Sequence, residues 1–274
     1  MDCIYCNSLL TVRNGHNDKG VQRYKCKDCG RRFCEKGIFA RHRYPLQIIL
    51  DALFLYSQPI STRGVTKNLK HFRKIKPSHV AVYNWVVKFS PKLIELAHKK
   101  AIHFTNIFHV DEKFIHVRKS KDKHAYLWIV SDSKSNIIAT HISFERDSAN
   151  AKIVLRKAKE RAGFSPELLI SDGLQGYKSA CSWVFGRKTR HVQAHFEAVN
   201  IIHKGKLMKI SNNRAERINE FYALWLHSIR GFKRLDRANL LVEFFAIYYN
   251  YLMPHGVKEK VKVQWQKIPV IINS

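Results

Sequence analysis

Two short apolar runs of the chain each lead directly to an aspartate, Asp111 and Asp172. Such runs are typical of buried strands, and polar residues at strand ends commonly form sites in α/β sheets. A third acid, Glu216, follows Asn212 and Asn213, which suit the start of a helix. Three carboxylates of this kind would bind two divalent cations, and their hard oxygens suit magnesium or manganese. Two such ions can activate an attacking oxygen and stabilise the leaving oxygen of a phosphodiester.

Four cysteines near the N-terminus form two CxxC pairs, Cys3 with Cys6 and Cys26 with Cys29, separated by 19 residues. This spacing is typical of a four-cysteine zinc site, because each turn points two thiolates at one side of the metal. A segment this short has little core, so one structural zinc ion would supply much of its folding energy. The alternative is four unbound thiols in an unstructured arm.

The charge balance indicates a polyanionic partner. The chain has 274 residues, with 49 Lys and Arg against 21 Asp and Glu, and a formal net charge of +28. Such an excess usually marks a nucleic-acid partner. Hydrophobic residues make up 45%, enough for a real core, which argues against a disordered tail or a simple RNA-coating protein. We see neither a signal peptide nor an apolar run of roughly 18–20 residues, so we expect a cytoplasmic, nucleoid-associated protein without a membrane partner.

Residues 43–98 carry a helical pattern in basic surroundings. The first helix follows Pro45, the second is capped by Ser61 or Thr62, and the third begins after Ser78 and is expected to end at Pro91. This layout is typical of a DNA-binding helix-turn-helix, although its second turn is longer than usual. The alternative is a three-helix packing unit with solvated lysines. The third helix would reach bases with three residues: His79, Tyr83 and Asn84.

From Phe104 onward the pattern changes from helical to extended. We expect strands at residues 107–110, 114–117, 126–130 and 137–144, a helix over 149–162 and a buried strand over 168–170. This order predicts the α/β class, with a mixed sheet flanked by helices that resembles an RNase H-like fold. Asp147 should cap the helix and Asp132 should lie in a turn. Three tryptophans are expected in the core: Trp128, Trp183 and Trp225.

Several segments together resemble the DDE transposases of prokaryotic insertion sequences. They are Asp111-Glu112-Lys113, Tyr126-Leu127-Trp128, Ser171-Asp172-Gly173 and residues 212–217. Residues 230–233 and 249–255 are similar to the integrase-core ending of such enzymes, and the resemblance covers residues 40–256. An N-terminal zinc ribbon also occurs among them. The resemblance implies an RNase H-like core that cleaves and joins DNA with magnesium or manganese ions, acting on element ends and target DNA as a homodimer or higher oligomer.

Residue by residue, Asp111, Asp172 and Glu216 match the catalytic and metal-binding triad of that family. Their separations are 61 and 44 positions, and the second is longer than usual, so the extra residues are expected in the basic stretch 187–209. Many relatives carry Lys or Arg seven positions after the glutamate, where this chain has Ala223. Either Arg217 or His227 would then take over that DNA contact, or the contact is lost.

Other acids and bases near the triad have competing interpretations. Glu220 is the main rival of Glu216, one helical turn later, and strand alternation should turn Glu112 to the opposite face of the sheet. His109 is expected to pack in its strand. Four basic residues are expected to border the acids and to hold DNA phosphates, unless they are simply solvated: Lys204, Lys206, Arg214 and Arg217.

The sequence therefore predicts four parts. These are a zinc ribbon (1–40), an all-α helix-turn-helix region (41–100), an RNase H-like catalytic domain (101–256) and a basic tail (257–274). The expected function is that of a DNA transposase. The alternatives are a nuclease or resolvase of the same fold, and a DNA-binding regulator in which ribbon and helix-turn-helix bind DNA while the acids are inactive.

Overall fold

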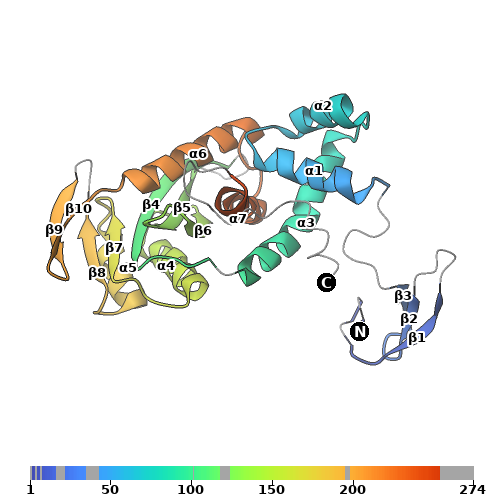
Figure 1. The fold of residues 1–274 in the computed structure, drawn as a ribbon, viewed down its shortest axis with the longest axis horizontal. Helices are drawn as coiled ribbons and strands as arrows, with labels where there is room; N and C mark the ends of the chain where they lie inside the picture. The colour runs from blue at the N-terminus through green and yellow to red at the C-terminus, as the bar shows by residue number, and fades with distance from the viewer. Residues whose placement is uncertain are drawn as a thin grey trace. The chain divides into compact units, whose positions relative to one another are not determined.

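The computed structural model describes most of the chain, in two compact units that we treat separately (Figure 1). The first unit contains the cysteine segment, and the second begins at Gln47. The described residues are 2–3, 5–6, 8–16, 22–34, 43–100, 102–117, 124–194 and 198–253. The predicted tail at 257–274 lies outside them. In this described part, no helix has both the length and the apolar character needed to cross a membrane.

A five-stranded mixed sheet is the centre of the second unit, in the order β6-β5-β4-β7-β8 (Figure 1). The strands are β4 (Ile107–His116), β5 (His124–Asp132), β6 (Ile137–Ser143), β7 (Leu168–Ser171) and β8 (Arg190–Gln193). β4, β5 and β6 pair antiparallel, whereas β7 runs parallel to both β4 and β8. The predicted strands at 107–110 and 114–117 are one strand, because the pairing of β4 with β5 is unbroken along both. The RNase H-like mixed sheet is confirmed.

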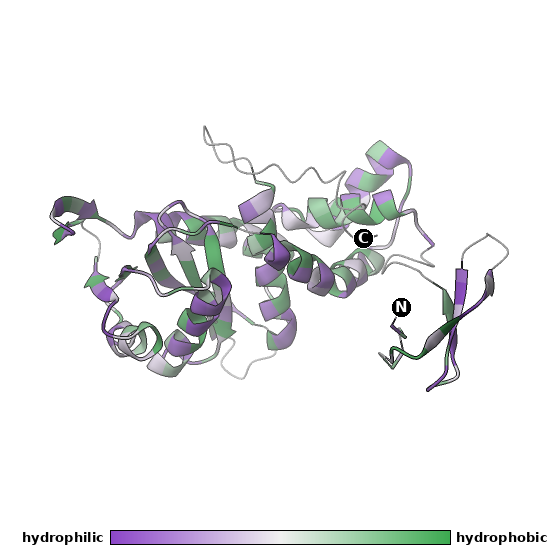
Figure 2. Ribbon diagram, turned by 60° about the horizontal axis from the view of Figure 1, so that its bottom comes forward, coloured by the Kyte–Doolittle hydropathy of each residue, from purple (hydrophilic) through white to green (hydrophobic). Residues whose placement is uncertain are grey.

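Helices cover both faces of this sheet. α4 (Ser148–Ala162) and α5 (Gly176–Phe185) pack on one face around Trp128, while α6 (Asn213–Ile229) and α7 (Leu235–Tyr251) contact the other. Hydrophobic and hydrophilic bands alternate around these helices in Figure 2, as expected for helices with one buried side. The hairpin of β9 (Val199–His203) and β10 (Lys206–Ile210) occupies the basic stretch before α6 and packs on Leu168 and Ile170 of β7.

The predicted role of Asp147 is confirmed, whereas Asp132, predicted in a turn, is the last residue of β5. Asp147 caps α4, with its Oδ1 accepting a hydrogen bond of 2.9 Å from the Asn150 backbone N–H. The buried Asp132 carboxylate accepts backbone hydrogen bonds from Lys134 and Asn136, which holds the turn after β5. Neither carboxylate is therefore available to the triad.

Three helices precede the sheet: α1 (Leu46–Ser57), α2 (Thr62–Arg73) and α3 (His79–Lys99). Ser61 and Ser78 cap α2 and α3 as predicted. The expectation that Pro91 ends the third helix is wrong, since α3 continues to Lys99. An internal proline costs roughly 3 kcal/mol. Apolar residues on both sides of it stay buried, and their packing offsets this cost: Val86, Phe89, Leu93 and Ile94.

The helical region packs directly against the C-terminal helices. The Trp225 indole N–H of α6 donates a 3.1 Å hydrogen bond to the Tyr56 carbonyl of α1, and the Tyr251 hydroxyl donates one of 2.8 Å to the Ala97 carbonyl of α3. From Gln47 onward, regions 41–100 and 101–256 thus belong, where described, to one compact unit. The predicted boundary at residue 100 separates two regions of sequence within that unit.

Trp225 should be a major source of its stability. The ring is fully buried and stacks on Phe245 at 4.9 Å, so we expect Trp225→Ala to lower the free energy of unfolding by about 3–5 kcal/mol. Trp183, expected in the core, is instead 61% exposed beside Arg156, and Trp183→Ala should cost less than about 1 kcal/mol. Urea unfolding of both variants measures the difference, and equal losses would contradict this account of the core.

Candidate metal and nucleic-acid site

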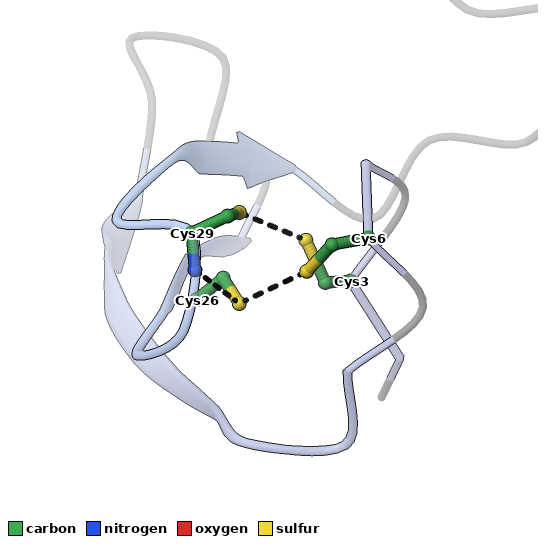
Figure 3. A group of neighbouring side chains, drawn as sticks. All are labelled: Cys3, Cys6, Cys26 and Cys29. Carbon is green, nitrogen blue, oxygen red and sulfur yellow. Dashed lines mark hydrogen bonds between the residues drawn. The ribbon is translucent and has the colours of Figure 1, made fainter.

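Four cysteine sulfurs converge in the first unit (Figure 3). All four Sγ atoms lie within 4.8 Å of one another, with 3.6 Å between Cys3 and Cys29 and between Cys6 and Cys26. A zinc tetrahedron with bonds of about 2.3 Å has sulfur–sulfur edges of about 3.8 Å, so this donor set suits the ion. The Cys29 backbone N–H donates to the Cys26 sulfur and helps to lower the pKa of that thiol, whereas burial and the other three cysteines raise the pKa of Cys6 in the metal-free cluster.

A small antiparallel sheet supports this cluster. Its strands are β1 (Thr11–His16), β2 (Gln22–Cys26) and β3 (Arg32–Cys34). The hydrophobic core of this segment consists of Cys3, Cys26 and Phe33. The Tyr24 ring stacks on the Phe33 ring, with 5.8 Å between the ring centroids. So small a core supports the expectation that a bound metal supplies much of the folding energy.

Asp111 and Asp172 meet because their strands are paired in register. Val110 of β4 lies opposite Ser171 of β7 in the parallel ladder, so the next residue on each strand is one of the two aspartates. Asp111 lies in the middle of β4, and Asp172 directly follows β7. Their carboxylates, with that of Glu112, each offer an oxygen within 4.8 Å of the others. These hard oxygen donors suit magnesium or manganese.

Glu112 corrects an expectation drawn from strand alternation. Its cross-strand neighbour is Trp128, which belongs to the α4/α5 core, so the side chain does leave the sheet on that face. The glutamate is nevertheless long enough for its carboxylate to approach both aspartates. Arg146 Nε donates a 2.6 Å hydrogen bond to Glu112 Oε1, and the buried Tyr177 hydroxyl donates to Oε2. Strand alternation thus predicted correctly the face of the sheet on which Glu112 leaves the strand, but not that its carboxylate reaches the two aspartates.

Like charge gathers around Asp111, which is only 9% exposed. Burial, followed by the charges of Glu112 and Asp172, raises the pKa of Asp111 to about 7. The charge of Glu216 adds to this rise. Burial alone would lower the pKa of Arg146, but its hydrogen bond to Glu112 and the nearby acids raise it. The free site therefore has excess negative charge that a cation would relieve.

The third acid of the triad does not join this group of carboxylates. Glu216 lies in the first turn of α6 and is exposed. Glu220, one turn later, is also exposed. Between them, Asn219 is buried and donates a 2.7 Å hydrogen bond from Nδ2 to Asp111 Oδ2. This contact brings α6 to Asp111, and the assignment of Glu216 as a ligand stays a prediction. Asn219, Arg146 and Tyr177 were not predicted as site residues.

The sequence held only weak signals for these three. Arg146 precedes the capping residue Asp147 at the end of a predicted strand, which is a common place for a site residue. Tyr177 lies on α5, a helix that was not predicted at all. Asn219 follows Glu216 by three positions, so the two share a helix face, and this spacing could have drawn attention to it.

The residues expected to bind DNA lie on the surface. His79, Tyr83 and Asn84 are exposed on α3, and Lys204, Lys206, Arg214 and Arg217 are exposed on the β9–β10 hairpin and α6. Lys204 Nζ pairs with Glu167 Oε1 at 2.6 Å. Exposure permits contact with DNA without testing it, so these assignments stay predictions.

A further feature lies next to Ala223. With His227, Lys113 and Arg230, it lines a groove of about 770 Å³ between α6 and β4. The alanine thus leaves open space flanked by three basic or imidazole side chains. Arg217 is exposed on the same helix. Many relatives carry Lys or Arg at the position of Ala223, and a replacement of its DNA contact by His227 or Arg217 stays a prediction.

His109 packs inside its strand as expected. It is 4% exposed, and burial, with the charge of Arg214, lowers the pKa of its imidazole to about 4. A histidine held neutral in this way adds no positive charge next to Asp111.

The fold and the paired aspartates define an RNase H-like enzyme core of the DDE class. Residues 105–252 match a family model described as a DDE domain, that of the IS240-type transposases (DDE_Tnp_IS240). This match spans more than half of the chain, and the chain belongs to this family of nucleic-acid-cleaving and -transferring enzymes. A search of curated protein sequences finds no significant match.

Solved structures with similar folds include retroviral integrases. The HTLV-2 integrase catalytic core in complex with magnesium is 14% identical, with a TM-score of 0.38, and the match covers 58% of this chain and 97% of that one. The BIV integrase core is 13% identical, with a TM-score of 0.37, over 56% and 88% of the two chains. A chain of the simian T-cell lymphotropic virus intasome is 16% identical, with a TM-score of 0.39; the match covers 59% of this chain and 55% of that chain. Below a TM-score of 0.5, these structures add nothing to the family assignment.

We expect the first unit to hold one zinc ion per chain. Cys26→Ser removes one of four thiolates and should abolish stoichiometric zinc, because a structural site needs all four ligands. Cys34→Ser is the matched control, since Cys34 is outside the cluster and should keep full zinc content. Colorimetric zinc release measures both. Zinc retained at one equivalent in Cys26→Ser would contradict this site.

The raised pKa of Asp111 should appear in the pH dependence of stability. The folded protein, free of magnesium and manganese, holds a proton that the unfolded chain loses near pH 4, so the stability from this group falls as pH rises through about 7. Relative to Asp111→Asn, the wild type should therefore lose free energy of unfolding between pH 5 and pH 8. Groups remote from Asp111 titrate alike in both proteins and cancel in the difference, whereas the acids coupled to Asp111 contribute to it.

Denaturant unfolding at several pH values, with the ribbon loaded with zinc, measures that difference. Manganese should stabilise the wild type more at pH 8 than at pH 6, because binding no longer has to displace a proton, and should not stabilise the variant. A difference between the two proteins that does not vary with pH would show that Asp111 ionises normally.

Proposed function

We propose that the chain is a DNA transposase that cleaves DNA strands at the ends of an insertion sequence and joins the freed 3′-hydroxyl groups to target DNA. The observation that carries this proposal is the convergence of Asp111 and Asp172 at adjacent positions of two paired strands. Membership in the DDE family supports it. Asp111, Asp172 and Glu216 hold the catalytic magnesium or manganese ions. When bound, such ions activate the attacking oxygen and stabilise the leaving oxygen.

The protein's contribution to this reaction is to position groups and to supply charge. Attack of water on phosphorus breaks the bond to the 3′ oxygen and leaves a 5′-phosphate and a 3′-hydroxyl. In the second step that hydroxyl forms a bond to the phosphorus of a target phosphodiester and breaks the bond to the target 3′ oxygen, which leaves as a 3′-hydroxyl. No covalent bond to the protein is needed. The Asn219 amide holds one Asp111 oxygen, burial restrains the Asp111 side chain, and strand pairing fixes the backbone next to Asp172. The same carboxylates serve both steps.

DNA binding is assigned to basic surfaces in each of the two units. The zinc ribbon and the exposed face of α3, with His79, Tyr83 and Asn84, would hold the element ends. Lys204, Lys206, Arg214 and Arg217 would hold backbone phosphates near the acids. Because two ends are joined in one event, the working form would be a homodimer or a higher oligomer.

The regulator alternative conflicts with the charge around Asp111. An inactive core would gain stability by losing a buried carboxylate that has two like charges within 4.8 Å. The nuclease alternative uses the same residues and ends after the first step. Only the reaction products separate it from a transposase.

Cleavage should depend on each acid of the triad. A labelled duplex from the DNA flanking the gene, incubated with manganese, should be nicked by the wild type. Cleavage should fall by at least about a thousandfold in Asp111→Asn, Asp172→Asn and Glu216→Gln, because each removes a charged metal ligand. Glu220→Gln should keep most of the activity.

The products and the binding assay distinguish the alternatives. A transposase joins the labelled strand to a supercoiled plasmid, whereas a nuclease releases it without joining. If the wild type binds the duplex as tightly as Asp111→Asn and never cuts it, the regulator alternative is correct. If Glu220→Gln loses activity while Glu216→Gln stays active, the third metal ligand is Glu220 and not Glu216.

A further inference from the structure

The loop between β6 and α4 carries an arginine to the edge of the acid site. Arg146 precedes Asp147, the cap of α4, so the backbone on its C-terminal side is tied to a helix end. Its guanidinium lies between two acids, with Nε donating to Glu112 Oε1 at 2.6 Å and Nη2 lying 3.6 Å from Asp172 Oδ2. The side chain is 44% exposed. A cation is thus held beside the aspartates and open to solvent.

The support beneath this arginine is rigid. The Glu112 side chain is only 3% exposed, and its second carboxylate oxygen accepts a hydrogen bond from the Tyr177 hydroxyl. Tyr177 is fully buried, with its ring packed edge-on against Trp128 at 5.9 Å. Both oxygens of Glu112 therefore have hydrogen-bond donors within the protein. A carboxylate held in this way is better suited to orient a guanidinium than to bind an ion.

Guanidinium geometry shows which donors are left for a ligand. An arginine presents five N–H groups along two usable edges. Glu112 takes the edge formed by Nε and Nη2. The edge formed by Nη1 and Nη2 remains, and a planar pair of donors of this kind matches a phosphate with two parallel hydrogen bonds.

We propose that Arg146 binds a backbone phosphate of the DNA strand at the acid site, and that Glu112 and Tyr177 are the positioning residues that hold it there. The proposal rests on the proposed function, since the phosphate is that of the DNA to be cut. Asp172 and the phosphate are both anionic, and Arg146 lies where it reduces the repulsion between them. Glu112, although close to the aspartates, is then not a metal ligand.

A merely structural role for Arg146 would be to neutralise Glu112. In that role the charge alone matters, Lys would replace Arg fully, and no DNA phosphate would be coupled to the residue. The phosphate role predicts otherwise. Lysine has one ammonium group that cannot bond Glu112 and a phosphate along two planar edges, so Arg146→Lys should recover only part of the lost binding.

The test measures DNA binding without divalent ions, so it does not depend on catalysis. Arg146→Gln should weaken binding to a short duplex roughly tenfold. It should also lower the slope of log affinity against log salt by about 0.9, the value for one phosphate contact. Arg156→Gln is the matched control, an exposed arginine of α4 that lies over the Trp183 ring. Its affinity and salt slope should match those of the wild type.

A scan with single methylphosphonate groups then identifies the phosphate. One neutralised position near the cut should weaken wild-type binding, while the same duplex should bind Arg146→Gln no more weakly than unmodified DNA does. Other sensitive positions should stay sensitive in the variant. If every neutralised position weakens the wild type and Arg146→Gln equally, Arg146 contacts no phosphate and the proposal fails.

Manganese binding tests the role given to Glu112. Thermal stabilisation by manganese should persist in Glu112→Gln and Arg146→Gln and be lost in Asp111→Asn. Loss in Glu112→Gln would make Glu112 a ligand and overturn its positioning role. Tyr177→Phe should weaken binding to the duplex as Arg146→Gln does, but to a smaller extent. The proposed function is judged separately by cleavage with wild type and Arg156→Gln, so either conclusion can fail alone.

Discussion

The in-register parallel pairing of β4 with β7 is the constraint on which the site depends. With Val110 opposite Ser171, the next residue on each strand is an aspartate, so backbone hydrogen bonding alone brings two like charges together. Such closeness is unfavourable, and burial of Asp111 makes it more so. The apolar residues of the sheet and α4 must stabilise the strands enough to hold this geometry. A one-residue slip would turn Asp111 to the opposite face and separate the pair.

Two different devices balance this charge in the metal-free protein. On the α4/α5 face, Arg146 neutralises Glu112 and lies 3.6 Å from Asp172. On the α6 face, the Asn219 amide donates to Asp111, and no ion pair to Asp111 is found among the described residues. Neutral His109 on the same strand does not help, because burial holds its pKa near 4. The unfavourable electrostatics are thus concentrated at Asp111, whose pKa rises to about 7 so that the metal-free fold favours a proton there.

Local signals in the sequence were sufficient for elements but not for distances between them. Periodicity and caps placed α2, α3 and α4, and apolar runs placed β5, β6 and β7, because each pattern reflects forces within a few residues. Pro91 was misread because burial on both sides of α3 outweighs a local preference. Glu112 was excluded by alternation, which gives the face of a side chain and not the reach of a glutamate. Arg146 and Tyr177 join the site only through tertiary packing, which no local pattern records.

Glu216 shows how a cation would change the balance of forces at this centre. Its charge and that of Asp111 repel, and without a metal the exposed first turn of α6 allows the glutamate to stay in solvent. The buried Asn219, three residues after Glu216, already anchors α6 to the strand. A divalent ion reverses the sign of the interaction between the two carboxylates. Assembly of the complete triad would then be a consequence of metal binding, whereas the paired aspartates are a consequence of folding.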